Sequence, residues 1–91
     1  MTNREILENN GYEPDNYVLF TNPNYDGAVV GVSDTDQVIY DYDLMIEAAM
    51  REEDWSYEEA VDWINVNAIR SLVYVDNAPI IQYRLYTDEE I

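Results

Sequence analysis

The distribution of apolar residues along this chain predicts four short strands. Runs rich in β-branched and aromatic residues cover residues 16–22, 28–32 and 37–41, and a fourth run, 80–86, alternates between apolar and polar positions. The second and third runs are separated by Ser-Asp-Thr-Asp, which has the composition of a turn. We therefore expect these two strands to form an antiparallel hairpin.

Two helices are predicted by their start signals. Thr2 and Glu5 have the spacing of a capping box, and Gly11 is expected to end the short helix that they begin. Either Asp41 or Asp43 is expected to cap a second helix, because aspartate is favoured at this position. The predicted inner face of this second helix consists of Leu44, Met45, Ala48 and Ala49.

A third helix is predicted after a break in the pattern at residues 54–56. Ser56 and Glu59 form a second capping box, and apolar residues then recur at helical spacing. The predicted buried stripe consists of Tyr57, Ala60, Val61, Ile64 and Ala68.

The element order is therefore α-β-β-β-α-α-β. There is no internal repeat, low-complexity segment or linker, so residues 1–91 are predicted to form a single acidic domain. We expect an α+β fold, with a small antiparallel sheet of about four strands and the helices packed on one face.

Charge is the most unusual property of the composition. Twenty acidic residues face four arginines, which gives a net charge of −16, and lysine, histidine and cysteine are absent. The apolar share of 47% is that of a globular protein, and no segment is long and apolar enough to span a membrane. The lack of cysteine and of a signal-peptide pattern fits the cytoplasm of a bacterial host.

These residue types leave few chemical functions open. The glycines, at positions 11, 27 and 31, form no phosphate-binding loop, and no histidine, lysine or cysteine is present for catalysis. We expect no enzyme activity and no cofactor. The sign of the charge opposes direct binding of nucleic acid.

Two places in the sequence carry residues that could bind a metal ion. Residues 22–33 resemble the first half of a calcium-binding EF-hand loop, but Ser33 stands where a bidentate glutamate is required. The second place is a set of four acids around the predicted strand 37–41, namely Asp34, Asp36, Asp41 and Asp43. These acids would bind a cation only if the ends of the strands came together in the fold, and aspartates at such positions more often end hairpins or cap helices. We therefore predict no metal site.

The segment 51–64, "REEDWSYEEAVDWI", contains six carboxylates, two tryptophans and one arginine. Some of these acids are explained by the preference of helix N-termini for negative charge, which would make them an ordinary solvated face. The alternative is an acidic ridge that binds a basic partner, with Trp55 as its aromatic anchor. The predicted ridge consists of Glu52, Glu53, Asp54, Glu58, Glu59 and Asp62. If this ridge is only a solvated face, the next candidates for partner binding are the acids of residues 86–90 and the aspartates Asp34, Asp36, Asp41 and Asp43.

The segment 63–85 resembles a family of small acidic proteins found in phages and bacterial mobile elements. The shared pattern is Asn-x-Ile-Arg-Ser-Leu-x-Tyr followed by Ala-Pro-Ile-Ile-x-Tyr, and Val73 stands where members often have proline. The matching residues are Asn67, Ile69, Arg70, Ser71, Leu72, Tyr74, Ala78, Pro79, Ile80, Ile81 and Tyr83. We expect Arg70 to pair with a carboxylate and Asn67 to close the end of a helix.

In size and charge the chain is similar to anti-CRISPR proteins and other DNA-mimic inhibitors, in which carboxylates stand in for phosphates. This resemblance implies a stoichiometric inhibitor whose partner is a basic nucleic-acid-binding protein, namely an RNA-guided nuclease of the host. Two alternatives stay open: an antitoxin or immunity protein that neutralises a basic toxin, and an interaction domain whose acidity serves only solubility.

Overall fold

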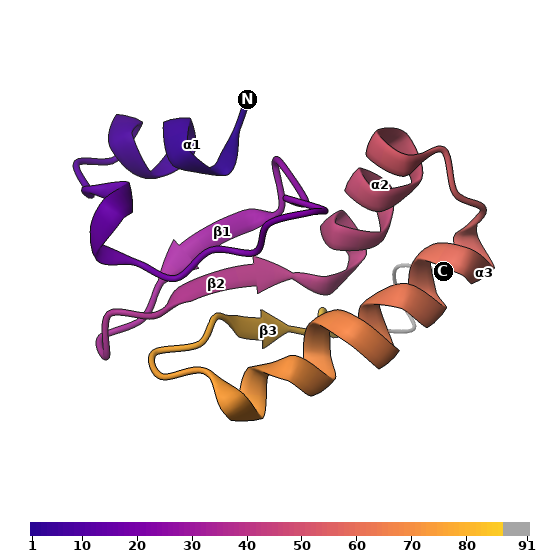
Figure 1. Ribbon diagram of the computed structural model, residues 1–91. Coiled ribbons are helices and arrows are strands. Elements are labelled where there is room, and N and C mark those ends of the chain that lie inside the picture. Colours follow the sequence, from indigo (N-terminus) through magenta and orange to yellow (C-terminus); the bar gives the residue numbers. More distant parts are fainter. Residues whose placement is uncertain (87–91) are drawn as a thin grey trace.

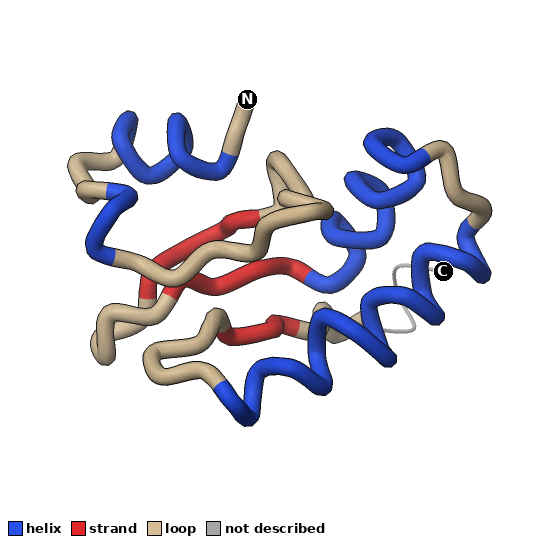
Figure 2. Tube along the Cα trace, in the orientation of Figure 1, coloured by secondary structure: helices blue, strands red, loops and turns tan. Residues whose placement is uncertain are grey.

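The computed structural model describes residues 1–86, which form a three-stranded sheet and three α-helices (Figures 1 and 2). The α-helices are α1 (Asn3–Asn9), α2 (Tyr42–Glu53) and α3 (Tyr57–Trp63), and the strands are β1 (Val29–Val32), β2 (Val38–Asp41) and β3 (Ile80–Gln82). Shorter helical segments are the 3-10 helices η1 (Pro14–Asn16) and η3 (Leu72–Tyr74), and the π-helix η2 (Ile64–Ile69), which continues α3 directly. The predicted α+β class is confirmed.

The sheet has the order β1-β2-β3 and is mixed. The predicted hairpin is confirmed, because β1 and β2 pair antiparallel with Val29 opposite Tyr40 and Val32 opposite Val38. The prediction of a purely antiparallel sheet is wrong, since β3 pairs parallel with β2. The chain leaves β2 through two helices before it reaches β3, and a helical crossover of this kind is what a parallel pair requires.

The predicted strand over residues 16–22 is not formed, so the sheet has three strands and the order of elements is α-β-β-α-α-β. This segment follows η1 and uses its aromatic and aliphatic side chains for packing against the core. The backbone N–H of Phe20 donates to the hydroxyl of Tyr40 at 3.0 Å instead of to a strand backbone. The strand predicted over 80–86 is also shorter than expected and ends at Gln82.

The helix-start signals are confirmed. Both capping boxes form, with the side chain of Thr2 accepting from the backbone N–H of Glu5 in the first, and α2 is capped by Asp41, not Asp43. An Asp41 carboxylate oxygen accepts a 2.9 Å hydrogen bond from the N–H of Leu44. Gly11 follows the end of α1 with a φ of +86°, a conformation that glycine adopts without strain.

One cluster of buried side chains joins the helices to the sheet. Val38 and Tyr40 lie on the same face of β2 and are fully buried, whereas Ile39 on the opposite face is partly exposed. The buried cluster therefore includes the Val38 and Tyr40 face of β2. Of the stripe predicted for the third helix, Ala60, Ile64 and Ala68 are buried and Val61 is partly buried, but Tyr57 is 61% exposed, so that assignment is wrong.

A buried amide, Asn3, fixes the loop that leads into β1. Its Nδ2 donates to the carbonyl oxygens of Asn24 and Tyr25 at 2.9 and 3.0 Å, and its Oδ1 accepts from the N–H of Gly27 at 3.0 Å. Because all these partners are backbone groups, one side chain of α1 holds the course of residues 24–27.

No helix within residues 1–86 is long and apolar enough to cross a membrane.

Candidate partner-binding surface

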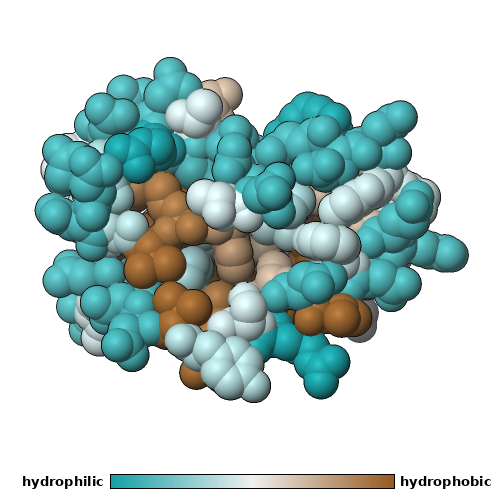
Figure 3. All heavy atoms as spheres, viewed as in Figure 1, coloured by the Kyte–Doolittle hydropathy of each residue, from teal (hydrophilic) through white to brown (hydrophobic). Residues whose placement is uncertain are grey.

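The six acids predicted to form a ridge lie where α2 ends and α3 begins. Figure 1 shows these two helix ends joined by a short connection, in which Asp54 has the left-handed φ of +56° that ends α2. All six side chains are exposed. We call this set the acidic corner; its members are Glu52, Glu53, Asp54, Glu58, Glu59 and Asp62. In the face shown in Figure 3, hydrophilic residues cover α2, and apolar residues gather near the strands.

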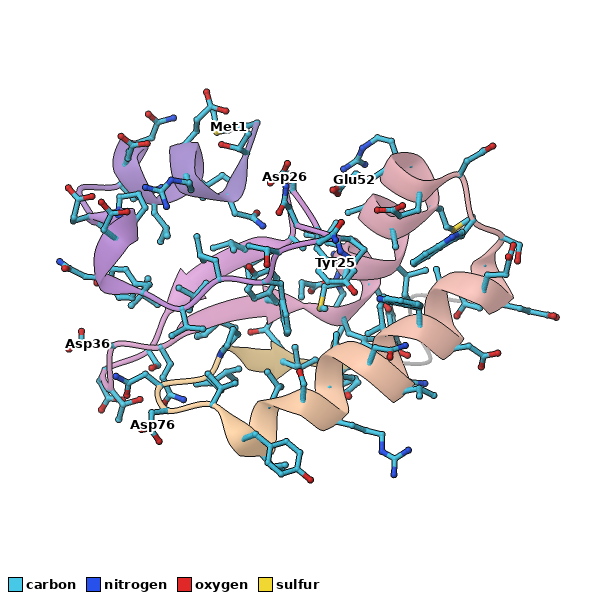
Figure 4. The ribbon with its side chains drawn as sticks, in the orientation of Figure 1. Met1, Tyr25, Asp26, Asp36, Glu52 and Asp76 are labelled. Carbon is cyan, nitrogen blue, oxygen red and sulfur yellow. The ribbon has the colours of Figure 1, made fainter. Side chains whose placement is uncertain are left out.

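Asp26, in the loop before β1, contacts the acidic corner through its backbone, while its partly buried carboxylate accepts a 3.1 Å hydrogen bond from the N–H of Asn3. The backbone N–H of Asp26 donates to the carboxylate of Glu52 at 3.0 Å, and the guanidinium of Arg51 donates to the carbonyl oxygen of Asp26 at 2.9 Å. Figure 4 shows Asp26 and Glu52 next to each other. The sequence analysis missed Asp26, because this contact joins segments that are 26 residues apart.

The acidic corner has little local compensation of its charge. Arg51, which is the only base of residues 51–64, donates to a backbone carbonyl. The ion pairs found within residues 1–86 are Arg4–Asp15 and Arg84–Asp41, and neither of them uses an acid of the corner. The carboxylates of the corner therefore face solvent as an excess of negative charge.

The predicted aromatic anchor, Trp55, is one half of a tryptophan pair. Trp55 is partly buried against the core, and its ring centroid lies 5.2 Å from that of Trp63, with the ring planes inclined at 44°. Trp63 is the more accessible member, at 41% exposure. The pair borders a shallow hollow of about 430 Å³, which we call the tryptophan hollow; it is lined by Trp55, Glu59, Asp62, Trp63, Val66 and Asn67.

The carboxylate of Glu59 has a defined position at this hollow. It accepts a 3.0 Å hydrogen bond from the backbone N–H of Ser56, while the N–H of Glu59 donates to the Ser56 hydroxyl at 3.2 Å. These hydrogen bonds to the backbone and side chain of Ser56 hold the pKa of Glu59 below its usual range. Glu59 is therefore negatively charged at neutral pH and is held by the helix cap.

The lining of the hollow continues from α3 into the π-helix η2, which begins directly after Trp63. Val66 and Asn67 of η2 line the hollow and are exposed, Val66 to 56%. The sequence analysis expected a regular helix through Ala68 and did not assign these residues to the surface. Insertions of π-helix into α-helices are rare and often mark functional sites.

The four secondary candidates are not brought together. Asp34 and Asp36 lie exposed in the turn between β1 and β2, whereas Asp41 and Asp43 lie at the other end of β2, where α2 begins. Within residues 1–86 no group of three or more acids is placed to hold a metal ion. The acids at positions 88–90, named as further alternatives, lie outside the described residues.

Asp41 has a structural role. Its buried carboxylate accepts a 2.8 Å hydrogen bond from Nε of Arg84, and burial, which alone would raise its pKa, is outweighed by the bonds from Arg84 and from the N–H of Leu44. The pKa of Asp41 is therefore lowered. Asp43 accepts from the hydroxyl of Tyr86. Arg84 thus has the carboxylate-pairing role that was expected of Arg70.

Of the two expectations attached to the family resemblance, the one for Asn67 is wrong, because Asn67 lies inside η2 instead of closing a helix. Arg70 is exposed and forms none of the ion pairs found within residues 1–86. Comparisons with protein-family models, with curated proteins and with solved structures found no match to this chain.

Proposed function

We propose that this protein is a stoichiometric inhibitor that binds the nucleic-acid-binding surface of a basic protein, and that its target is an RNA-guided nuclease. On this proposal it is an anti-CRISPR protein that acts as a DNA mimic. The observation that carries the proposal is the acidic corner: six exposed acids from two helices and the connection between them, beside an arginine that donates to a backbone carbonyl.

Electrostatics favours this kind of partner. Nucleases of this class hold their nucleic acids in positively charged channels, and lysine and arginine contacts to phosphates position the duplex without reading its sequence. Exposed carboxylates on a rigid protein surface can accept the same contacts. A net charge of −16 also steers a basic partner toward the complex over long distances, so association should be fast and should slow as salt is added.

The tryptophan hollow supports a role in binding proteins. Trp63 and Val66 expose apolar area next to carboxylates, and aromatic anchors bordered by charged residues are typical of the energetically important parts of interfaces. The resemblance of residues 63–85 to small proteins of phages and mobile elements supports the same direction, because such elements must evade nucleases of the host.

The test compares two variants with the same change of charge. In the first, Glu58→Gln, Glu59→Gln and Asp62→Asn neutralise three acids of the corner. The matched control is Asp34→Asn, Asp36→Asn and Asp76→Asn, which are exposed positions of the hairpin turn and of the loop before β3; Figure 4 shows Asp36 and Asp76 at the end of the molecule away from Glu52.

The measurement is cleavage of target DNA by a guide-loaded nuclease, with competition between the protein and the duplex for binding. We expect the corner variant to inhibit at least tenfold more weakly than the parent, while the control inhibits as the parent does. Equal inhibition by the corner variant and the parent would show that the acidic corner is only a solvated face. Equal loss in both variants would show that net charge matters and position does not.

A further inference from the structure

We propose that the tryptophan hollow is a binding site for an arginine side chain of the partner, with the guanidinium stacked on Trp63 and bound by the carboxylates of Glu59 and Asp62. This inference rests on the proposed function, because it names the group of a basic partner that the surface would recognise. Such a site would bind arginine in preference to lysine, whereas a uniform acidic surface would not discriminate between the two.

The aromatic side of the hollow suits a planar cation. Trp63 is 41% exposed although its neighbour Ile64 is fully buried, so one part of the indole ring is open while the chain around it is fixed. Indole is the best of the aromatic rings for binding a cation on its face, and guanidinium can also stack on it as a flat group. Val66, which is exposed in the lining next to Trp63, offers apolar contact to the methylene stem of such a side chain.

The acidic side of the hollow supplies the charge complement. Glu59 and Asp62 are three residues apart on α3, so they lie on neighbouring positions of one helix face, and both line the hollow with Trp63. Guanidinium presents several N–H donors in one plane and can bind two carboxylate oxygens at once. Lysine presents a point charge without this plane, so it gains less from the ring and the carboxylates together.

The hollow is organised before binding. The capping box holds Glu59 through Ser56, and Trp55 is fixed between the core and Trp63. A site whose side chains are already held loses less conformational entropy when it is occupied. This distinguishes the tryptophan hollow from the exposed acids at the end of α2, which do not line it.

The experiment uses the intact protein and two short peptides of equal charge, hexa-arginine and hexa-lysine, with binding measured by calorimetry at low salt. We expect the parent to bind hexa-arginine about fivefold or more tighter than hexa-lysine. Trp63→Leu should bring this ratio close to one. Tyr74→Leu, which removes an aromatic ring that is 87% exposed elsewhere on the surface, should leave the ratio unchanged.

Two further measurements make the outcome decisive. Glu52→Gln with Glu53→Gln should weaken both peptides equally, because these acids do not line the hollow and glutamine at position 52 keeps an oxygen for the N–H of Asp26. If Trp63→Leu does not fold, the parent is titrated with N-acetyl-arginine amide and with the lysine equivalent. The NMR signal of the Trp63 indole N–H should then move with the arginine compound and move much less with lysine.

Failure of this inference differs from failure of the proposed function. Equal binding of the two peptides by the parent, or a ratio that survives Trp63→Leu, overturns the arginine site and leaves an acidic inhibitor intact. No binding of either peptide at low salt overturns both. Loss of nuclease inhibition in the corner variant together with equal peptide binding supports the inhibitor and rejects the arginine site.

Discussion

The Nδ2 atom of Asn3 donates a 3.0 Å hydrogen bond to the carbonyl oxygen of Tyr25, and this contact joins helix α1 to the loop that carries Asp26 toward the acidic corner. Asn3 is 3% exposed and bonds only to backbone groups through its side chain. The position of Asp26 beside Glu52 therefore depends on an amide of helix α1.

We expect Asn3→Ala to lower the free energy of unfolding by about 3 kcal/mol, because it leaves several buried backbone groups without partners. The measurement is urea unfolding followed by circular dichroism. Asn9→Ala is the control, since Asn9 is an exposed residue of the same helix. A loss below about 0.5 kcal/mol for Asn3→Ala would show that the loop has other support.

The hydroxyls of two buried tyrosines should have opposite effects on stability. Within residues 1–86 the Tyr25 hydroxyl has no hydrogen-bond partner, whereas the Tyr40 hydroxyl accepts from the N–H of Phe20. We expect Tyr25→Phe to raise the free energy of unfolding by about 1 kcal/mol and Tyr40→Phe to lower it by about 1–3 kcal/mol. Urea unfolding of both variants measures this, and a clear destabilisation by Tyr25→Phe would show that its hydroxyl is satisfied in solution.

The same two residues should limit stability at alkaline pH. Burial raises the pKa of Tyr25 to about 12 and that of Tyr40 to about 12. Above pH 10 the unfolded chain releases these protons and the folded protein keeps them, so stability falls as pH rises from about 10 to 12, by about 1.4 kcal/mol per pH unit for each tyrosine. Tyr25→Phe should halve this contribution in unfolding experiments at pH 9–12. The prediction is contradicted if the stability of Tyr25→Phe falls with pH as steeply as that of the parent.

The ion pair between Asp41 and Arg84 should contribute to stability at neutral pH. Asp41→Asn keeps an oxygen for the N–H of Leu44 but loses the charge that faces Arg84, and we expect a loss of about 1–3 kcal/mol at pH 7. Because the pKa of Asp41 is lowered by folding, its contribution is present above the ordinary aspartate pKa of about 4 and is lost as pH falls below that value.

The measurement is a double-mutant cycle with Arg84→Gln, repeated at pH 7 and at pH 3. The coupling between the two positions should be present at pH 7 and should shrink at pH 3. Additive effects at both values would mean that Asp41 acts only as the cap of α2.

Salt should stabilise this protein. The net charge of −16 leaves repulsion that the two ion pairs found within residues 1–86 offset only slightly, so about 0.2–0.5 M sodium chloride should raise the melting temperature by several degrees. The Asp34→Asn, Asp36→Asn, Asp76→Asn variant, with three fewer negative charges, should respond less. A flat or falling response in the parent would show that the charges are compensated locally.

The parts of the fold that depend on neighbouring residues were predictable. The capping boxes at Thr2 and Ser56, the cap at Asp41 and the β1–β2 hairpin are encoded within a few residues each, and all four formed as expected. The parallel register of β3 depends on contacts across the whole crossover. The segment 16–22 has strand composition, but its backbone bonds to the side chain of Tyr40 instead of to a strand.

The candidate surface was predictable in its acids and less so in its aromatic part. Carboxylates around the α2–α3 junction follow from sequence position, because consecutive helices joined by a short turn bring their ends together. Trp63, Val66 and Asn67 lie along one side of α3 and η2 next to Glu59 and Asp62, and they were not recognised because the sequence does not show that Trp55 packs against this side. Asp26 reaches the surface only through the long-range bonds of Asn3 and Glu52.

The parallel pairing of β2 with β3 sets an order of events during synthesis. Ile39 pairs with Ile80, so one edge of β2 stays unpaired until the ribosome has synthesised the helices between β2 and β3. An open strand edge is a template for pairing with other unfinished chains, and polysomes hold such chains close together. The acids of α2 and α3 are translated during that interval, and like charges of this kind disfavour contact between two such chains until β3 covers this edge of β2.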